Sequence, residues 1–286
     1  MNSESSATGP KNFREVEETI LTDLKGQMSY SDYLQLDTVL SAQNPLSTEH
    51  DEMLFIIIHQ ASELWLKLAG HEVSSAISNI RSSNFRHAFK VVARVRQILN
   101  QLVHSWDILA TLTPVDYLKF RPFLGPASGF QSYGYRKLEF LLGNKNAGLV
   151  KVHDNNAPAF EELNQILHAP SLYDEVLRKL HEQGFAIDAG LLQRDFSGPY
   201  QPNESVLNAW LEIYRDSEQH FLLYELAEKL VDIEDAFQQW RFKHMYTVQR
   251  IIGHRRGTGG SSGVPFLKKA LDISFFPELL DLRTKL

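Results

Sequence analysis

Two histidines far apart in the chain lie inside apolar stretches and could do chemistry. His59 stands in FIIIHQASELW, residues 55–65, and His244 stands in FKHMYTVQRIIG, residues 242–253. A glycine-rich stretch, GTGGSSG at 257–263, follows the second histidine, and the chain has no cysteine. This combination suits a buried iron porphyrin, because the porphyrin supplies four nitrogens and the protein adds one axial imidazole. For each histidine taken alone, the plainer interpretation of a core-packed side chain stays open.

Other metal sites and phosphate sites are not indicated by the sequence. No Glu is followed by His three residues later, as helical di-iron sites require, and no HExxH pair is present. The absence of cysteine excludes thiolate-ligated haem, iron–sulfur clusters and Cys-based zinc sites. The glycine stretch lacks GxxxxGK[ST], and Ser262 stands where GxGxxG needs its third glycine. The stretch is instead typical of a hinge or lid, in which Thr258 supplies a hydroxyl group.

Arg121 is a charged residue among aromatic and proline neighbours. Tyr117 and Arg121 are four residues apart, so they share one face at the end of a short helix. A guanidinium in such apolar surroundings needs an anionic partner, either in a structural salt bridge or on a substrate carboxylate. Phe55 shares a helix face with His59 in the same way, either as part of the core or as the wall of a pocket.

The elements that must position these side chains are helices. Apolar residues at three- and four-residue steps predict a long helix over about 49–80, started by Thr48 and Asp51, and a second from Asn84 to about 112. Thr113 and Pro114 predict the start of a short helix that ends near Arg121. Further helices are expected at about 132–142, at 157–184 as two helices broken at Pro170, at 204–230, at 233–252 and before Phe275, with loops at 122–126 and 190–203.

The predicted fold is therefore all-α, a single-domain bundle of long antiparallel helices with a buried haem pocket. A chain of 286 residues is short enough to fold around a single hydrophobic core. Its net charge of −6 gives no reason to expect nucleic-acid binding. No apolar run is long enough for a transmembrane helix. The polar N-terminus lacks the apolar region of a secretory signal, which favours a cytoplasmic location, and we expect a disordered tail over 1–12.

Four stretches of the chain together resemble the tryptophan 2,3-dioxygenase family. They lie at 30–47, 50–68, 116–139 and 242–267, and the resemblance runs from about residue 24 to the C-terminus. A histidine at position 59 favours this family over the related indoleamine dioxygenases, which have serine there. The resemblance implies a haem enzyme that cleaves the indole C2–C3 bond of L-tryptophan with O2. The implied product is N-formyl-L-kynurenine, the first in the kynurenine route; the alternative is a non-catalytic haem-based sensor or binding protein.

Carried onto this sequence, the resemblance also implies roles for individual residues. His244 would be the axial iron ligand of a non-covalent haem b that is ferrous when active, and His59 would be the catalytic residue that hydrogen-bonds the indole N–H. The implied substrate-binding residues are Phe55, His59, Tyr117, Arg121, Thr258, Tyr30, Tyr33 and Leu34. The implied cofactor-binding residues are His244, Trp106, Ser128 and Gly129.

The resemblance finally implies an assembly. The segment 13–47 would reach the active site of a neighbouring subunit, and 48–286 would form the haem-binding catalytic domain. The expected partners are L-tryptophan, O2 and three further copies of the chain in a homotetramer arranged as a dimer of dimers. Neither a nucleic acid nor a membrane is expected as a partner.

Overall fold

The structure is a computed structural model that describes residues 12–14 and 16–286. This part of the chain contains α-helices and 3-10 helices and no strand, which confirms the all-α prediction. The chain divides into two compact units, Met1–Asn44 and Pro45–Leu286. The tail expected over 1–12 lies, except for Asn12, outside the described residues. No helix in the described part combines the length and the apolar character needed to cross a bilayer.

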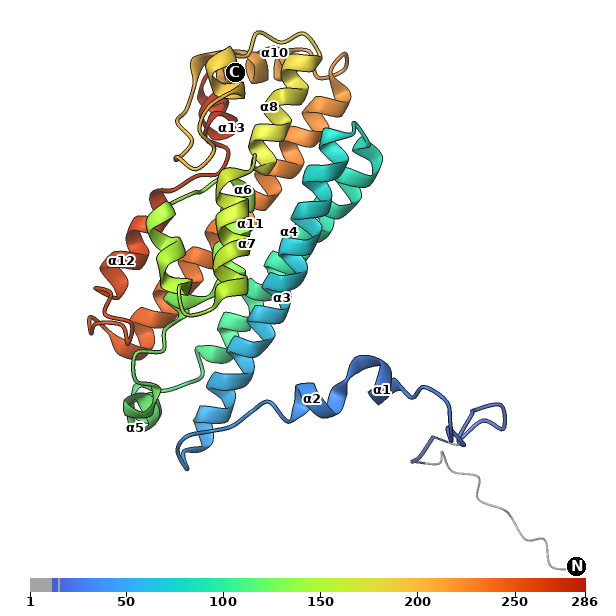
Figure 1. The fold of residues 1–286 in the computed structure, drawn as a ribbon, viewed down its shortest axis with the longest axis vertical. Helices are drawn as coiled ribbons and strands as arrows, with labels where there is room; N and C mark the ends of the chain where they lie inside the picture. The colour runs from blue at the N-terminus through green and yellow to red at the C-terminus, as the bar shows by residue number, and fades with distance from the viewer. Residues whose placement is uncertain (1–11, 15) are drawn as a thin grey trace, which may run out of the picture. The chain divides into compact units, whose positions relative to one another are not determined.

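Three long helices form the frame of the larger unit: α3 (His50–Arg81), α4 (Phe85–Leu109) and α11 (Phe221–Ile252). Helix α4 packs against both α3 and α11, so the three run side by side (Figure 1). Ala76 of α3 and Ala88 of α4 are completely buried, and such small side chains let neighbouring helix axes approach closely.

The shorter elements pack around this frame. Helices α6 and α8 pack against α3, and α5 contacts both α3 and α11. The remaining elements of the larger unit are α5 (Pro114–Phe120), η1 (Arg121–Leu124), η2 (Gly129–Gln131), α6 (Tyr133–Leu142), η3 (Ala147–His153), α7 (Ala157–His168), α8 (Leu172–Glu182), α9 (Ala189–Leu192), α10 (Glu204–Arg215), α12 (Val264–Lys269), η4 (Ala270–Asp272), α13 (Pro277–Asp281) and η5 (Leu282–Thr284).

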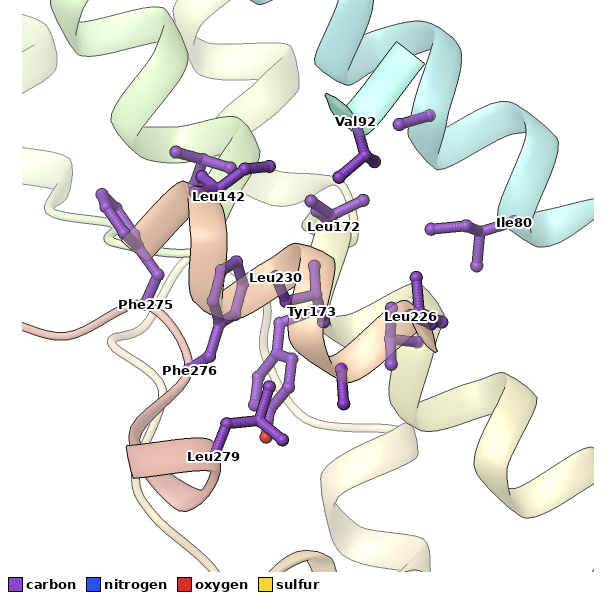
Figure 2. Close-up of a cluster of buried hydrophobic side chains, with 14 of the residues drawn as sticks. Ile80, Val92, Leu142, Leu172, Tyr173, Leu226, Leu230, Phe275, Phe276 and Leu279 are labelled. Atoms are coloured by element: carbon purple, nitrogen blue, oxygen red, sulfur yellow. The ribbon is translucent and has the colours of Figure 1, made fainter. Parts of the chain in front are cut away.

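The main hydrophobic core lies where α3, α4, α8, α11 and the C-terminal segment meet (Figure 2). Ile80, Leu230 and Phe276 are completely buried there. The carboxylate of Glu234 on α11 accepts hydrogen bonds from the backbone N–H groups of Phe275 at 2.6 Å and Phe276 at 3.0 Å. These bonds satisfy backbone groups of a non-helical segment that is buried, and so fix the C-terminal segment on the core.

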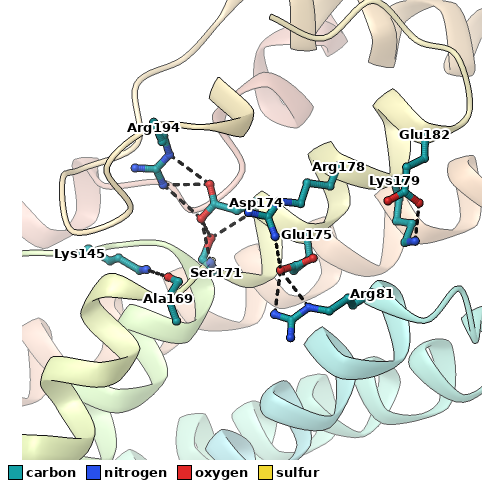
Figure 3. Close-up of polar contacts among 10 residues, drawn as sticks. All are labelled: Arg81, Lys145, Ala169, Ser171, Asp174, Glu175, Arg178, Lys179, Glu182 and Arg194. Atoms are coloured by element: carbon teal, nitrogen blue, oxygen red, sulfur yellow. Dashed lines mark hydrogen bonds and ion pairs between the residues drawn. The ribbon is translucent and has the colours of Figure 1, made fainter. Parts of the chain in front are cut away.

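Buried carboxylates hold α8 to its neighbours (Figure 3). Asp174 pairs with Arg194 at 3.0 Å, and Glu175 pairs with Arg81 of α3 at 2.9 Å. The buried Lys145 donates to the carbonyl oxygen of Leu167 at 3.0 Å, and burial lowers the pKa of Lys145 to about 8. The far end of α3 is thereby tied to α8, and the segment after α6 is tied to the end of α7.

Several predicted helix boundaries are confirmed. Helix α5 begins at Pro114, where the Thr113 hydroxyl accepts a hydrogen bond from the Asp116 N–H at 3.2 Å. Helix α6 ends at Gly143, whose φ of +118° is readily adopted by glycine. The chain is interrupted at Pro170, between α7 and α8, as expected.

Three predicted features were wrong or incomplete. Thr48 and Asp51 do not cap α3; Glu49 is the N-cap, without a side-chain bond. The carboxylate of Glu52, in the first turn of α3, accepts hydrogen bonds from the backbone N–H groups of Leu46 at 2.8 Å and Ser47 at 2.7 Å, in the segment before the helix. A polar loop was expected at 190–203, but residues 190–192 belong to the short helix α9 (Ala189–Leu192). Helix α13, which follows Phe276, was not expected.

The largest error concerns the break between the last two long helices. The expected break at 231–232 lies within α11, and the chain breaks at 216–220 instead. The Asp216 carboxylate accepts from the Gln219 N–H at 3.2 Å, which gives the backbone an alternative to helical bonding. Asp232 stays in the helix, where it pairs with Arg96 of α4 at 3.4 Å.

The smaller unit contains two short helices, α1 (Tyr30–Leu34) and α2 (Leu36–Leu40), neither of which has a buried residue. The side chains of Tyr30 and Tyr33 are each 74% exposed. Neither α1 nor α2 therefore contributes to a hydrophobic core.

The core predicts a contrast between two leucines on α11. Leu230 is completely buried and Leu222 is 53% exposed. Leu230→Ala should lower the free energy of unfolding by about 2–5 kcal/mol, because it removes buried methyl groups and leaves a cavity. Leu222→Ala should change it by less than about 0.5 kcal/mol. Urea unfolding of both variants tests this, and equal losses would show that the core is placed wrongly.

Candidate active site

The imidazole of His244 lies among aromatic rings from α4 and α11. The Trp106 ring stacks on it with centroids 4.7 Å apart and ring planes 10° from parallel, and the Trp240 ring lies 5.3 Å away. Burial, together with the smaller effect of the charge that His59 carries when protonated, lowers the pKa of His244 to about 4. The ring is therefore neutral at pH 7, which is the form that binds metal ions.

Two indole N–H groups beside His244 have no hydrogen-bond partner. The Nε1 atoms of Trp106 and Trp240 are both buried and unpaired. An unpaired buried donor is costly, so both atoms indicate that an acceptor on a ligand completes this region. No group of three or more metal-ligating side chains occurs in the described part of the chain, so a metal here needs ligand atoms from a cofactor. One neutral imidazole beside two free donors fits a haem with carboxylate side chains.

His59 presents one defined nitrogen to its surroundings. Its Nδ1 lies 2.7 Å from the carbonyl oxygen of Phe55, one turn earlier on α3. A carbonyl oxygen can only accept, so Nδ1 carries the proton and Nε2 of the neutral ring has a free lone pair. Burial lowers the pKa of His59, although the Phe55 carbonyl and the Glu63 carboxylate oppose the shift. At neutral pH, His59 is therefore an acceptor at Nε2.

Aromatic rings enclose this side of the site. The Phe55 ring lies 4.2 Å from that of His59, 5.5 Å from that of Phe120 and 5.9 Å from that of Tyr117, measured between centroids. Phe120 and Tyr117 are buried in a second apolar cluster, which joins α3, α4, α5 and α11. The rings form an apolar wall, and burial raises the pKa of the Tyr117 hydroxyl, against the effect of the neighbouring Arg121.

Arg121 has unused hydrogen-bonding capacity. Its Nη2 donates to the carbonyl oxygen of Arg256 at 2.6 Å, while its Nε is buried without a partner. Among residues 12–14 and 16–286, no carboxylate lies within ion-pair distance of this guanidinium. A structural salt bridge, one of the two interpretations of Arg121, is thus not found in that part of the chain. Arg121 and Thr258 instead line the same cavity, of about 380 Å³.

The glycine loop, defined here as residues 257–263, rests on the chain before α6. The Thr258 hydroxyl donates to the Ala127 carbonyl oxygen at 2.5 Å. A Cβ atom on Gly259 would lie 2.7 Å from the Cβ of Ser128, so only glycine fits this contact. Gly263 has a φ of +72°, and a Cβ there would lie 2.5 Å from the Arg255 carbonyl oxygen. The loop conformation therefore depends on glycine at two of its positions.

The structure gathers some of the predicted site residues and leaves others apart. His59, Phe55 and Tyr117 meet in one cluster, and His244 meets Trp106. Ser128 contacts the glycine loop, and Gly129 begins η2 beside it. Tyr30, Tyr33 and Leu34 belong to the unit Met1–Asn44 and are not placed relative to the site. Sequence reasoning missed Trp240, although its position one turn before His244 was a usable signal.

The fold and the site define an all-α protein with an apolar, histidine-lined site that can hold a cofactor. The family model for tryptophan 2,3-dioxygenase matches residues 14–286. The chain is 70% identical over 275 residues to the tryptophan 2,3-dioxygenase of Shewanella woodyi, covering 96% of each chain. It is 54% identical over 264 residues to that of Ralstonia pickettii, covering 92% of this chain and 95% of the relative.

The chain belongs to the tryptophan 2,3-dioxygenase family. It is accordingly an oxidoreductase that oxidises tryptophan in the kynurenine pathway, and its family is haem-dependent. The alternative of a non-catalytic haem sensor has no support from these relatives.

The lowered pKa of His244 predicts how the haem-free protein responds to acid. The unfolded chain takes up a proton near pH 6.5 and the folded protein only near pH 4, so acid favours unfolding. The free energy of unfolding should fall by about 3 kcal/mol through this residue as the pH drops from about 6.5 to about 4. The measurement is urea unfolding at pH 7 and pH 4.5.

His244→Gln should remove most of this acid sensitivity, because glutamine does not titrate. His71→Gln, a change at an exposed position on the same bundle, is the control and should retain it. The same loss of stability in wild type and His244→Gln would contradict the placement of His244 in a buried site.

Proposed function

We propose that this chain cleaves the indole C2–C3 bond of L-tryptophan with O2 at the site between α3, α5 and α11, and releases N-formyl-L-kynurenine. The observation that carries the proposal is that two neutral imidazoles, His59 and His244, contact rings that pack on one apolar cluster, Phe55 and Trp106. Tyr117 of the same cluster neighbours Arg121, a cation with no carboxylate partner among the described residues. The family supplies the reaction, and this arrangement supplies a place for each part of the substrate.

His244 is the residue that would hold the haem iron. It is neutral, it is fixed by the Trp106 ring, and the free Nε1 donors of Trp106 and Trp240 are available to acceptors on the cofactor. Because the sequence has no cysteine, the haem would be held without a thioether link, as haem b is. When bound, haem supplies the iron that binds and activates O2. Ser128 and Gly129, beside the glycine loop, are further proposed cofactor contacts.

His59 would orient the indole ring. Its Nε2 has a free lone pair, so it can accept a hydrogen bond from the indole N–H while Nδ1 stays bound to the Phe55 carbonyl. Phe55 would lie against the indole ring, and the surrounding aromatic wall excludes water from the reacting bond. This role needs no proton removal, which suits the weak acidity of an indole N–H.

Arg121 and Thr258 would bind the amino-acid end of the substrate. The free Nε of Arg121 and its remaining N–H groups can bind a carboxylate in the paired geometry that guanidinium favours. Thr258 lines the same cavity as Arg121, and its hydroxyl oxygen can accept from the substrate ammonium group. Tyr117 lies beside this position at the end of the aromatic wall.

Replacing the haem ligand should separate haem binding from folding. His244→Ala should lose the Soret band of the purified protein and its activity, because the change removes the imidazole that would hold the haem iron. His71→Ala, at an exposed position of α3, should keep both. Absorption at 321 nm, where N-formylkynurenine absorbs, reports turnover. A His244→Ala protein with a full complement of haem and unchanged turnover would refute the assignment.

Replacing Arg121 should weaken substrate binding. Arg121→Ala should lower kcat/KM for L-tryptophan, because the substrate carboxylate would be left unpaired. The fall should correspond to a loss of about 2–5 kcal/mol in transition-state stabilisation. Arg215 also donates to one backbone carbonyl, that of Lys285, but lies on α10 away from the site, so Arg215→Ala is a matched control. Steady-state kinetics test both, and an unchanged kcat/KM for Arg121→Ala would exclude the clamp.

We also propose that Tyr30, Tyr33 and Leu34 cover the site of a neighbouring copy in a homotetramer. The support is their exposure, at 74%, 74% and 39%, on a segment that buries none of its own side chains. Deletion of residues 1–40 should dissociate the tetramer in analytical ultracentrifugation and lower turnover, because both depend on the same contact. A fully active monomer would contradict the shared site.

A further inference from the structure

We propose that Glu63 is a positioning residue that holds the glycine loop in place through Ser132. The proposal concerns the platform, defined as residues 126–132, on which the glycine loop rests. Its structural part stands without the proposed function. Its consequence for substrate binding rests on the proposed roles of Arg121 and Thr258.

Glu63 connects α3 to the start of α6. It lies one turn after His59, and its carboxylate accepts a hydrogen bond from the Ser132 hydroxyl at 2.5 Å. The Ser132 oxygen in turn accepts from the Tyr135 N–H at 3.1 Å and so caps α6. A Cβ on Gly134 would lie 2.7 Å from Oε2 of Glu63, so glycine makes the room for this carboxylate. Glu63 and Leu66 of α3 therefore both lie where the two helices approach closely.

Hydrogen bonds continue from Ser132 through the platform. The Ser132 N–H donates to the Gly129 carbonyl oxygen at 3.0 Å. The Gln131 side chain accepts from the Ser128 N–H at 3.3 Å and donates to the Pro126 carbonyl oxygen at 3.3 Å. These bonds make the platform a short, internally bonded unit, and the Glu63–Ser132 hydrogen bond joins it to α3.

The platform is also where the glycine loop docks. Thr258 donates to the Ala127 carbonyl oxygen, and Gly259 lies directly against Ser128. A shift of the platform therefore shifts the surface that supports Thr258. Since Thr258 lines the cavity with Arg121, Glu63 is connected to the substrate end of the site through its bond to Ser132, the bonds inside the platform, and the contacts of the platform with the glycine loop.

Limited proteolysis of the full-length holoenzyme without tryptophan tests the structural part. Arg255 and Arg256 are exposed just before the glycine loop, so trypsin cleavage there reports how firmly the loop is docked. Glu63→Ala and Ser132→Ala should each speed this cleavage roughly threefold or more, because local opening becomes easier. Glu63→Gln should cleave at the wild-type rate, because its amide oxygen still accepts from Ser132. Glu212→Ala, at an exposed carboxylate on α10, is the control.

Three results decide the proposal. An unchanged cleavage rate in Glu63→Ala, or a rate in Glu63→Gln as fast as in Glu63→Ala, would overturn it. If Glu63→Ala lowers Tm by more than Glu212→Ala does, general destabilisation would also speed its cleavage. In that case the cleavage rates of Ser132→Ala and Glu63→Gln are compared instead. The double variant Glu63→Ala/Ser132→Ala should cleave no faster than either single variant, because both break the same contact. Additive acceleration would overturn the link.

Kinetics then test the consequence for the substrate. In Glu63→Ala, KM for L-tryptophan should rise while kcat stays within about twofold, and Glu63→Gln should restore KM. Faster cleavage without a rise in KM would overturn the link from platform to substrate. If the proposed function itself were wrong, no tryptophan turnover would be measurable in wild type, yet the proteolysis result would still stand.

Discussion

The site depends on the packing of α4 against both α3 and α11. That packing sets the distance and the rotation of the two helices that carry His59 and His244. Because that packing shields much of both imidazoles from water, both have lowered pKa values and are neutral at pH 7. Neutrality is what gives each ring its chemical use: His244 keeps a lone pair for a metal, and His59 keeps one for a donor. The hydrophobic core and the chemistry of the site thus rest on one set of helix contacts.

Three buried donors in the described chain remain unpaired, and all three surround the proposed site. They are the Nε1 atoms of Trp106 and Trp240 and the Nε of Arg121. Each costs on the order of 1–3 kcal/mol when it is buried without an acceptor. Buried charged groups elsewhere have partners: an opposite charge for Glu175 and Asp174 of α8 (Figure 3), and backbone groups for Glu234 and Lys145. This concentration of unmet donors indicates that the fold is completed by acceptors on its ligands.

The sequence was sufficient where local chemistry decides the structure. The periodicity of α3 and α4, the Thr113 cap and the stop at Gly143 all depend on nearby residues. The break at 216–220 was not predictable by the same means, because no glycine or proline marks it, and Asp232 lies inside α11, where it pairs with Arg96 of another helix. At the site, the sequence showed two apolar-flanked histidines, but only tertiary packing shows that the rings they contact, Phe55 and Trp106, pack on the same apolar cluster. That Arg121 has no carboxylate partner among the described residues depends likewise on every element packed around it.

The glycine loop shows how a flexible sequence can hold a defined place. Its own conformation is set by steric limits at Gly259 and Gly263, and its position is set by contacts with residues 121–128: Arg121 to the Arg256 carbonyl, Ala127 to Thr258, and Ser128 to Gly259. All three supports lie between the start of η1 and the start of η2. The two residues proposed to bind the amino-acid end of the substrate, Arg121 and Thr258, therefore share one support. A change that moves this stretch must move both together, so the carboxylate site is kept or lost as a unit.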